Sequence, residues 1–261
     1  MKINVLDKGY IALIEVMGTD ATIAETARVS TQSKGKNNEG LIRRLMRDRH
    51  TSPFEFGEIH IEVKAPIFVF RQMFRHRTLN LNEQSLRYSE SNCEFYVPTI
   101  ERMQAQSVDN RQGSGEMLSV ENALLCMANL ADSRVASRLT YDNLLRLGLT
   151  RELARNVLSF DLYASARIKC DIHNWLHFLK LRTDKHAQFE IQQYANAIEL
   201  IIADKFPITY KAWIDYVKEA VTFSKQEMKW IKDFYEYDRI RYEVIEGKYE
   251  KEFNQFLEKL K

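Results

Sequence analysis

The stretch Glu58-Ile59-His60-Ile61-Glu62-Val63-Lys64 alternates between polar and apolar side chains at every position. Because successive side chains of a β-strand point to opposite faces, this period of two predicts a strand with one dry face. A second run with the same period covers residues 162–172, where apolar side chains occupy the even positions. Two such strands among helical segments indicate an α+β fold: a single domain with a mixed or antiparallel sheet flanked by helices.

Helical spacing, capping residues and helix-ending residues predict the other elements. We expect Asp20 to cap the first helix, Pro66 to begin the helix after the first long strand, and Gly148 to end the longest helix. Residues 2–16 predict two short strands, and residues 89–114 are expected to be irregular apart from a short strand at 94–97. The predicted helices cover residues 20–29, 41–46, 66–74, 116–147, 150–157, 174–181 and 186–206.

The composition of the 261 residues, 45% hydrophobic and 28% charged, is that of a soluble globular protein. A net charge of +2 gives no reason to expect nucleic acid or a membrane as a partner. No apolar run approaches the roughly 18 residues that a membrane-spanning helix needs. The N-terminal residues have no signal-peptide pattern, so we expect a cytoplasmic location. The three cysteines lack Cys-x-x-Cys spacing, which predicts reduced thiols, with Cys170 in the core.

The segment with the densest polar chemistry follows the first long strand and an apolar stretch at 65–74. It reads Arg75-His76-Arg77-Thr78-Leu79-Asn80-Leu81-Asn82-Glu83-Gln84-Ser85-Leu86-Arg87-Tyr88. Such a segment is either a solvated loop or a site that holds an anion and a polar ring. Arginine matches phosphate bidentately, and the amides suit a planar heterocycle or a ribose. Because no glycine-rich phosphate loop occurs in the sequence, side chains would have to bind any nucleotide.

A second candidate lies at residues 179–190. If this segment is helical, His186 and Glu190 share one polar face, turned away from the apolar stripe of the same helix; an ordinary solvated face is the alternative. Arg182 precedes two N-cap residue types and is expected near a helix junction.

Two further groups have ordinary explanations. Residues 151–155 are explained locally as a charged pair on a short helix. Asp171, His173 and His177 have a spacing that could ligate a metal, but the stronger His-Glu-x-x-His pattern is missing and we expect no metal.

The polar segment resembles the signature of the flavin-dependent thymidylate synthases: Arg-His-Arg, seven residues, then Ser, with Asn-Glu-x-Ser-x-Arg inside. Further landmarks of the family match in the same order over roughly residues 1–215. They are Lys64-Ala65-Pro66-Ile67-Phe68-Val69 with Arg71-Gln72, Glu94-Phe95-Tyr96-Val97-Pro98, and the run from Leu181-Arg182 to Glu190-Ile191. The resemblance therefore implies a catalytic domain at 1–215. Residues 216–261 form an extension to which the resemblance gives no role, and the charged and aromatic pattern from residue 225 on predicts that it is an amphipathic helix.

The resemblance implies a reductive methylation. Deoxyuridine monophosphate would gain a methyl group from methylenetetrahydrofolate, with reducing equivalents passing from NADPH through FAD, and without an enzyme nucleophile. It also implies a homotetramer with shared active sites, so that the site residues of one centre would come from different chains.

Residue roles follow from the resemblance position by position. Arg182 would stabilise negative charge on the uracil, Ser85 would position the substrate, and His50 would lie near the flavin and folate. The deoxyuridylate would be held by Gln72, Arg75, Glu83, Gln84, Ser85, Arg87, Arg155 and Arg182. FAD would be contacted by Ser52, Arg75, His76, Arg77 and Glu83.

Two departures from the family pattern stand out. Asn80 occupies a signature position that is usually Ser. Asp171, His173 and His177 occupy a region where many members contact FAD through Asn and Arg. This implies that here FAD is contacted by different side chains in that region. From the residues alone, two other functions stay open: a nucleic-acid-binding module that uses the signature arginines, and a metal hydrolase at Asp171, His173 and His177.

Overall fold

The computed structural model of the chain describes residues 1–32, 35–108, 112–226, 228 and 231–232. The chain divides into two compact units, Met1–Lys218 and Glu219–Lys261. Most of the amphipathic helix predicted from residue 225 on lies outside the described residues. The first unit carries the sheet and every residue proposed for the site.

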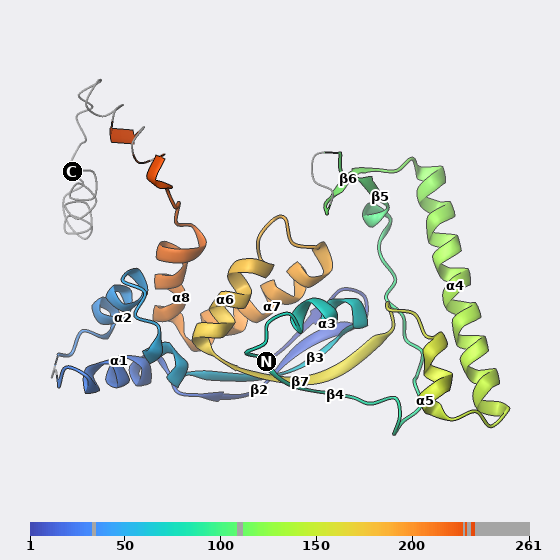
Figure 1. The fold of residues 1–261 in the computed structure, drawn as a ribbon, viewed down its shortest axis with the longest axis horizontal. Helices are drawn as coiled ribbons and strands as arrows, with labels where there is room; N and C mark the ends of the chain where they lie inside the picture. The colour runs from blue at the N-terminus through green and yellow to red at the C-terminus, as the bar shows by residue number, and fades with distance from the viewer. Residues whose placement is uncertain (33–34, 109–111, 227, 229–230, 233–261) are drawn as a thin grey trace. The chain divides into compact units, whose positions relative to one another are not determined.

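A five-stranded antiparallel sheet organises the first unit (Figure 1), in the order β1-β2-β3-β7-β4. The two long strands predicted from their alternation are confirmed: β3 and β7 are neighbours, with Glu58 opposite Asp171 and Pro66 opposite Tyr163. The edge strand β4 was not predicted, because all four of its side chains are exposed and show no alternation. The strands are β1 (Lys2–Val5), β2 (Gly9–Met17), β3 (Glu58–Pro66), β4 (Asn80–Glu83) and β7 (Tyr163–Asp171).

The hydrophobic core lies between one face of this sheet and two helices, α6 (Ile172–Arg182) and α7 (Phe189–Lys205). Ile59, Ile61 and Val63 of β3 are fully buried, whereas the polar residues that alternate with them are half-buried. The dry face predicted for β3 is therefore confirmed. Cys170 is also buried in this core, as expected.

A group of shorter elements covers the end of the sheet: α1 (Asp20–Val29), α2 (Asn38–Arg47), the 3-10 helix η1 (Ser52–Phe56), α8 (Pro207–Trp213) and the π-helical η4 (Ile214–Lys218). The predicted role of Asp20 is wrong, because Thr19 caps α1. Asp20 is instead buried, and its carboxylate accepts hydrogen bonds from Ile208 N at 2.8 Å and from Thr209 N at 3.0 Å. It thus caps α8, far along the chain, and ties α1 to it.

The segment between β3 and β7 contributes β4 to the sheet but lies mostly outside it. It contains α3 (Ile67–Met73), η2 (Ile100–Arg102), a hairpin of β5 (Gln104–Gln106) and β6 (Ser114–Met117), α4 (Val120–Arg146), α5 (Arg151–Ala154) and η3 (Arg155–Val157). Where a strand was expected at 94–97, a single bridge joins Phe95 to Leu162. The hairpin was not predicted, and it delays the start of α4, which Ser119 caps. Gly148 follows α4 with φ +87°, the left-handed conformation expected of a helix-ending glycine.

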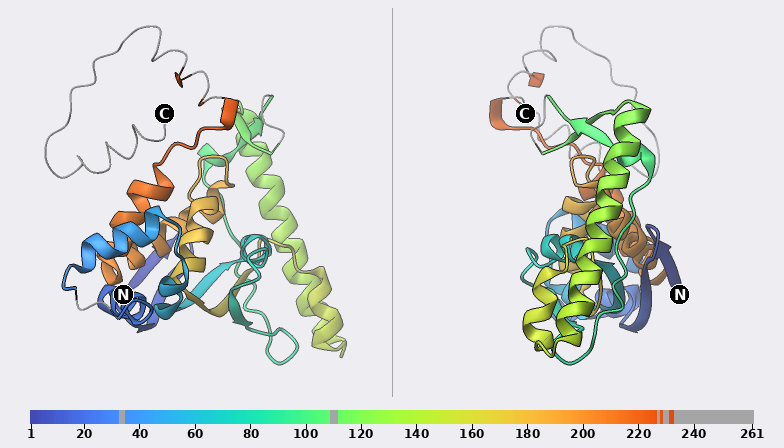
Figure 2. Two further views of the ribbon diagram at one scale, coloured as in Figure 1. Left: turned by 60° about the vertical axis from the view of Figure 1, so that its left-hand side comes forward. Right: turned by 90° about the vertical axis from the view of Figure 1, so that its right-hand side faces the viewer.

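Helix α4 stands at one side of the first unit, away from the sheet (Figure 2), and packs mainly against α5, η2 and η3. Only Ala123 and Tyr141 of its side chains are buried. Large apolar side chains therefore stay exposed along its length: Val120, Leu124, Leu125, Leu130, Val135 and Leu139. Within the described ranges, no helix has the combined length and apolar character that crossing a bilayer requires.

Candidate active site

Arg182, the last residue of α6, is held from two sides by the segment that follows β3. Its Nε donates to His76 Nε2 at 3.1 Å, and its Nη2 donates to the backbone carbonyl of Gln72 at 3.4 Å. The His76 ring packs edge-on against Phe178, with ring centroids 4.9 Å apart. These contacts fix the guanidinium at the point where α3 ends and the signature begins. Arg182 lies at a helix end, as expected, but Thr183 is the C-cap of α6 and α7 begins only at Phe189, so the predicted N-cap role of Thr183 and Asp184 is wrong.

The His76 imidazole is neutral at physiological pH. Its pKa falls from 6.5 to about 4, first because the ring is buried and then because Arg182 and His177 lie nearby. A neutral ring has one acceptor nitrogen, and the hydrogen bond from Arg182 places that acceptor at Nε2. His76 therefore orients Arg182 without adding a competing positive charge.

Within the part of the chain that the structure describes, the arginines around this junction have no carboxylate in salt-bridge range. Burial, followed by the charge of Arg75, lowers the pKa of Arg182. Across the described residues, no ion pair forms to any of Arg71, Arg75, Arg77, Arg155 and Arg182. Unpaired cations that lie close together repel each other. An anion that binds among them relieves this repulsion and lowers the electrostatic free energy.

Strand β4 carries the middle of the signature to the edge of the sheet. Glu83 lies opposite Ala166, and Gln84 N donates to Ser165 O at 2.8 Å, which extends the pairing by one residue. Burial raises the pKa of Glu83, while Arg71 and Arg155 oppose that rise. Glu83 thus lies between two arginines from separate segments, α3 and η3.

The end of the signature folds onto α5. Ser85 Oγ accepts a hydrogen bond from Arg87 N at 3.2 Å, and Arg87 Nη2 forms an ion pair with Glu152 Oε2 at 3.2 Å. Arg151 pairs with Glu90 at 3.3 Å. The purely local explanation of residues 151–155 is therefore incomplete, since Glu152 pairs with Arg87 of the signature and Arg151 pairs with Glu90, just beyond it. An open pocket of about 280 Å³ lies here, lined by Arg87, Tyr88, Thr150, Arg151 and Glu152.

The predicted polar face at His186 and Glu190 is wrong. Helix α7 begins at Phe189, so His186 lies in the preceding turn, where its backbone N and its Nδ1 both lie 2.8 Å from Asp184 Oδ1. Glu190 is buried, with 3% of its surface exposed. It does not face solvent but lies in the interior with the residues of the apolar stripe.

Glu190 is the centre of a hydrogen-bond network that the sequence did not indicate. Its carboxylate accepts from Tyr96 Oη at 3.2 Å, Arg102 Nε at 3.0 Å and Gln188 Nε2 at 2.8 Å. Gln188 Oε1 in turn accepts from Gln72 Nε2 at 2.6 Å. Arg102 and Tyr96 are about 90 positions away along the chain, so no local pattern could have found them.

The remaining predicted residues lie at the other end of β7 or on its flank. Asp171 lies opposite Glu58, next to η1, which Ser52 begins; both Ser52 and His50 are exposed. The Asp171 carboxylate caps α6, accepting from Asn174 N and Asn174 Nδ2, each at 2.8 Å. His173 lies in the first turn of α6.

The rest of α6 links the two ends of this region. His177 lies one turn beyond His173, with its ring 6.0 Å from that of His76. Among the residues that the structure describes, no three His, Cys, Asp or Glu side chains are grouped to hold a metal.

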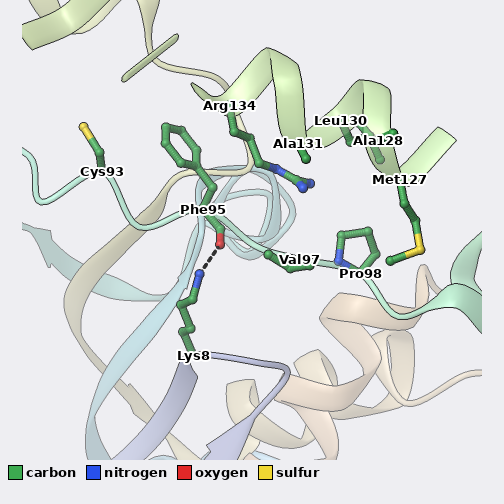
Figure 3. Close-up of a pocket in the computed structure, with 10 residues that line it drawn as sticks. All are labelled: Lys8, Cys93, Phe95, Val97, Pro98, Met127, Ala128, Leu130, Ala131 and Arg134. Atoms are coloured by element: carbon green, nitrogen blue, oxygen red, sulfur yellow. Dashed lines mark hydrogen bonds between the residues drawn. The ribbon is translucent and has the colours of Figure 1, made fainter. Parts of the chain in front are cut away.

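A separate open pocket of about 470 Å³ lies between the turn at Lys8, residues 93–98 and α4 (Figure 3). Its lining is mostly apolar, and Lys8 Nζ donates to Phe95 O at 2.8 Å across one side. None of the residues predicted for the site lines it, so this pocket and the arginines near the signature are distinct features.

The fold is an antiparallel α+β sheet, with arginines that form no ion pair within the described residues lying near its edge strand and at the end of α6. The family model described as "Thymidylate synthase complementing protein" matches residues 12–208. The flavin-dependent thymidylate synthase of Ruegeria pomeroyi is 46% identical over 85% of this chain and 76% of its own length. That of Thermus thermophilus is 43% identical over 88% of this chain and 84% of its own length.

Solved structures agree with these relatives. A UMP/dUMP methylase from Streptomyces cacaoi, bound with 5-Br UMP, has a TM-score of 0.75 and 32% identity, covering 83% of this chain and 98% of its own. The same enzyme bound with 5-Br dUMP has a TM-score of 0.75 at 30% identity, over 83% and 99% of the two chains. The chain belongs to the flavin-dependent thymidylate synthase family.

Proposed function

We propose that this protein converts deoxyuridine monophosphate to deoxythymidine monophosphate, with methylenetetrahydrofolate as the carbon donor and NADPH as the reductant through FAD. Family membership supports the reaction class. The observation that carries the proposal is a group of arginines that form no ion pair within the described residues. Arg71 of α3 and Arg155 of η3 lie near Glu83, and Arg182 of α6 is bonded to His76. Such a group suits the phosphate of a nucleoside monophosphate and the pyrophosphate of a dinucleotide.

The nucleotide is held by residues from both ends of the signature. Arg182 stabilises the negative charge that develops on the uracil between its two carbonyls, a task for which a guanidinium stays charged at any working pH. Because His76 and the Gln72 carbonyl already hold Arg182, little reorganisation is needed when that charge appears. Ser85 positions the substrate. The phosphate and sugar contacts are assigned to Gln72, Arg75, Glu83, Gln84, Arg87 and Arg155.

The residues proposed for FAD fit an anionic dinucleotide. Arg75 and Arg77 supply charge at the start of the signature, and His76 and Glu83 supply ring and carboxylate contacts. Ser52, His173 and His177 extend the site along α6 and η1, and His50 lies beside η1. Asp171 contributes through α6, since both of its oxygens are engaged by Asn174. When bound, FAD supplies the hydride that the methylation requires.

We further propose a homotetramer with shared active sites. The apolar side chains that α4 exposes in one chain support an interface there, since a monomer rarely exposes so many along one helix. His50 and Ser52 lie near the Asp171 end of β7, away from Arg155 and Arg87, so residues from a second chain can complete a site that one chain leaves divided. Sedimentation of the purified protein tests the assembly.

Two other assignments belong to the same proposal. Residues 1–215 form the catalytic domain and 216–261 an extension, which is compatible with the division of the chain after Lys218. A cytoplasmic location is supported by the three unpaired thiols, Cys93, Cys126 and Cys170.

One experiment tests the reaction. The purified protein is expected to carry a flavin spectrum that NADPH bleaches, and to form deoxythymidylate only when deoxyuridylate and methylenetetrahydrofolate are both supplied. A folded protein that binds no FAD, or that forms no deoxythymidylate with every substrate present, refutes the proposal.

A further inference from the structure

Glu190 is a buried carboxylate, and its hydrogen bonds determine which end of the Gln188 side-chain amide, nitrogen or oxygen, faces it. Oε1 accepts from Tyr96 Oη and Arg102 Nε, and Oε2 accepts from Gln188 Nε2 at 2.8 Å. A carboxylate paired with a guanidinium accepts hydrogen bonds and donates none. The group of Gln188 that faces Glu190 is therefore its amide nitrogen, and the carbonyl oxygen points the other way.

That orientation is passed to Gln72. Gln188 Oε1 accepts from Gln72 Nε2 at 2.6 Å, so the amide nitrogen of Gln72 faces Gln188. The carbonyl oxygen Oε1 of Gln72 accepts no hydrogen bond from any residue within the described ranges. The backbone carbonyl of the same residue holds Arg182. The chain of hydrogen bonds thus runs from a buried carboxylate to the residue beside the proposed uracil site.

We propose that Glu190 and Gln188 are positioning residues that fix the Gln72 amide so that its carbonyl oxygen faces the nucleotide. This inference rests on the proposed function, in which Gln72 contacts deoxyuridylate. The two orientations of a free amide have nearly the same shape but present opposite groups. The network selects the acceptor, which binds a donor of the nucleotide, a ring N–H or a sugar hydroxyl.

The variant Glu190→Gln inverts the chain of hydrogen bonds. The new amide keeps its carbonyl toward Arg102 and Tyr96, which are donors, and so turns its nitrogen toward Gln188. Gln188 and then Gln72 rotate in response, and Gln72 presents a donor where the nucleotide also has a donor. We expect the dissociation constant for deoxyuridylate, measured by calorimetry on the FAD-loaded protein, to rise roughly tenfold.

A double-mutant cycle separates this role from general support of the fold. Gln72→Met removes the amide but keeps an unbranched side chain, and is expected to weaken deoxyuridylate binding roughly tenfold. Adding Glu190→Gln to it is expected to cause no further loss, because Glu190 acts through the amide that is gone. Losses that multiply to roughly a hundredfold overturn the proposal.

Glu199→Gln is the matched control. Glu199 is a second buried carboxylate on α7, bonded to Tyr210 Oη at 2.8 Å and to Lys218 Nζ at 2.5 Å, outside the network. It is expected to lower the melting temperature and leave deoxyuridylate binding unchanged. Equal weakening by both variants would show a general effect of a lost buried charge and overturn the proposal. If Glu190→Gln does not fold, Gln188→Met, at an exposed position, replaces it in the cycle. Because this variant frees the Gln72 amide and does not invert it, the expected loss of deoxyuridylate binding is smaller, and it again disappears once Gln72→Met is present.

The inference and the reaction fail in different ways. Normal deoxythymidylate formation with multiplying losses in the cycle refutes the positioning role and leaves the reaction intact. Binding of deoxyuridylate without turnover refutes the reaction, and the cycle then still decides the positioning role. Absence of deoxyuridylate binding by the unaltered protein refutes both.

Discussion

The two ends of the signature segment are held in opposite ways. At its start, His76 and Gln72 hold Arg182 with hydrogen bonds in a half-buried environment, and none of these partners neutralises its charge. At its end, Arg87 is already neutralised by Glu152, and the two side chains are 55% and 58% exposed. One arginine is fixed but left charged, while the other is paired but loosely held.

This difference separates two tasks. A charge that must stabilise a transition state is most effective when its surroundings do not reorganise during the reaction, and the Arg182 site has that property. A charge that captures a phosphate must exchange its partner for the ligand, which costs little when the pair is exposed. Removing partners should therefore harm the first site and help the second.

The largest effect is expected from Arg182→Ala. Loss of the cation that stabilises charge on the uracil should lower kcat for deoxythymidylate formation roughly 100- to 1,000-fold, with FAD still bound. Arg167→Ala is the matched control, because Arg167 pairs with Glu62 on the exposed side of the sheet, at 2.9 Å. Turnover of Arg182→Ala close to that of Arg167→Ala would contradict the assigned role.

Arg87→Ala tests the other end of the segment. Removal of one charge-assisted bond to a phosphate should weaken deoxyuridylate binding by roughly tenfold or more, with kcat at saturating substrate changed far less. Titration of the nucleotide and steady-state rates measure the two effects. An equal loss in kcat would place Arg87 in the chemical step and erase the contrast with Arg182.

His76 gives the first site a pH dependence of stability. Because its pKa is about 4 in the folded protein and 6.5 ordinarily, the unfolded chain binds a proton first as the pH falls. The contribution of neutral His76 to the free energy of unfolding is fully present above about pH 6.5 and is lost as the pH falls from about 6.5 to about 4.

The measurement is urea unfolding at pH 7 and pH 5 for the unaltered protein and for His76→Gln, at one protein concentration. The glutamine carbonyl still accepts from Arg182 but does not titrate in this range. The variant should lose less stability on acidification, and an identical loss in both proteins would disprove the assignment.

The smallest effect, with the opposite sign, is expected from Glu152→Gln. Releasing Arg87 from an exposed ion pair should tighten deoxyuridylate binding by up to about fivefold, since such pairs contribute at most about 1 kcal/mol. Weaker binding in this variant would show that Glu152 holds Arg87 in its binding position, as His76 does for Arg182.

Elements with an alternating pattern were predictable and others were not. The dry faces of β3 and β7 appear directly in the sequence, because burial on one side selects an apolar residue at every second position. The edge strand β4 and the β5–β6 hairpin are exposed on both sides, so no alternation marks them. Their strand character comes from pairing with a neighbour, and pairing partners are not written into a local pattern.

The candidate site divides in the same way. The signature from Arg75 to Arg87, with Arg182, is dense enough in arginines and amides to be found by composition and by family resemblance. The burial of Glu190 could not be predicted from the sequence, because its donors Tyr96 and Arg102 come from a distant segment. Local sequence reasoning predicted that Glu190 lies on a solvent-exposed helix face, whereas the structure shows it buried among tertiary contacts.

The sequence by itself determined the two central strands, the helices that cover them and the residue types that bind an anionic nucleotide, since these depend on periodicity and local chemistry. Only the tertiary structure decided which cations are paired and which are left for a ligand. Pairing depends on distances between segments separated along the chain, as Asp20 with α8, Arg87 with Glu152 and Arg182 with His76 show.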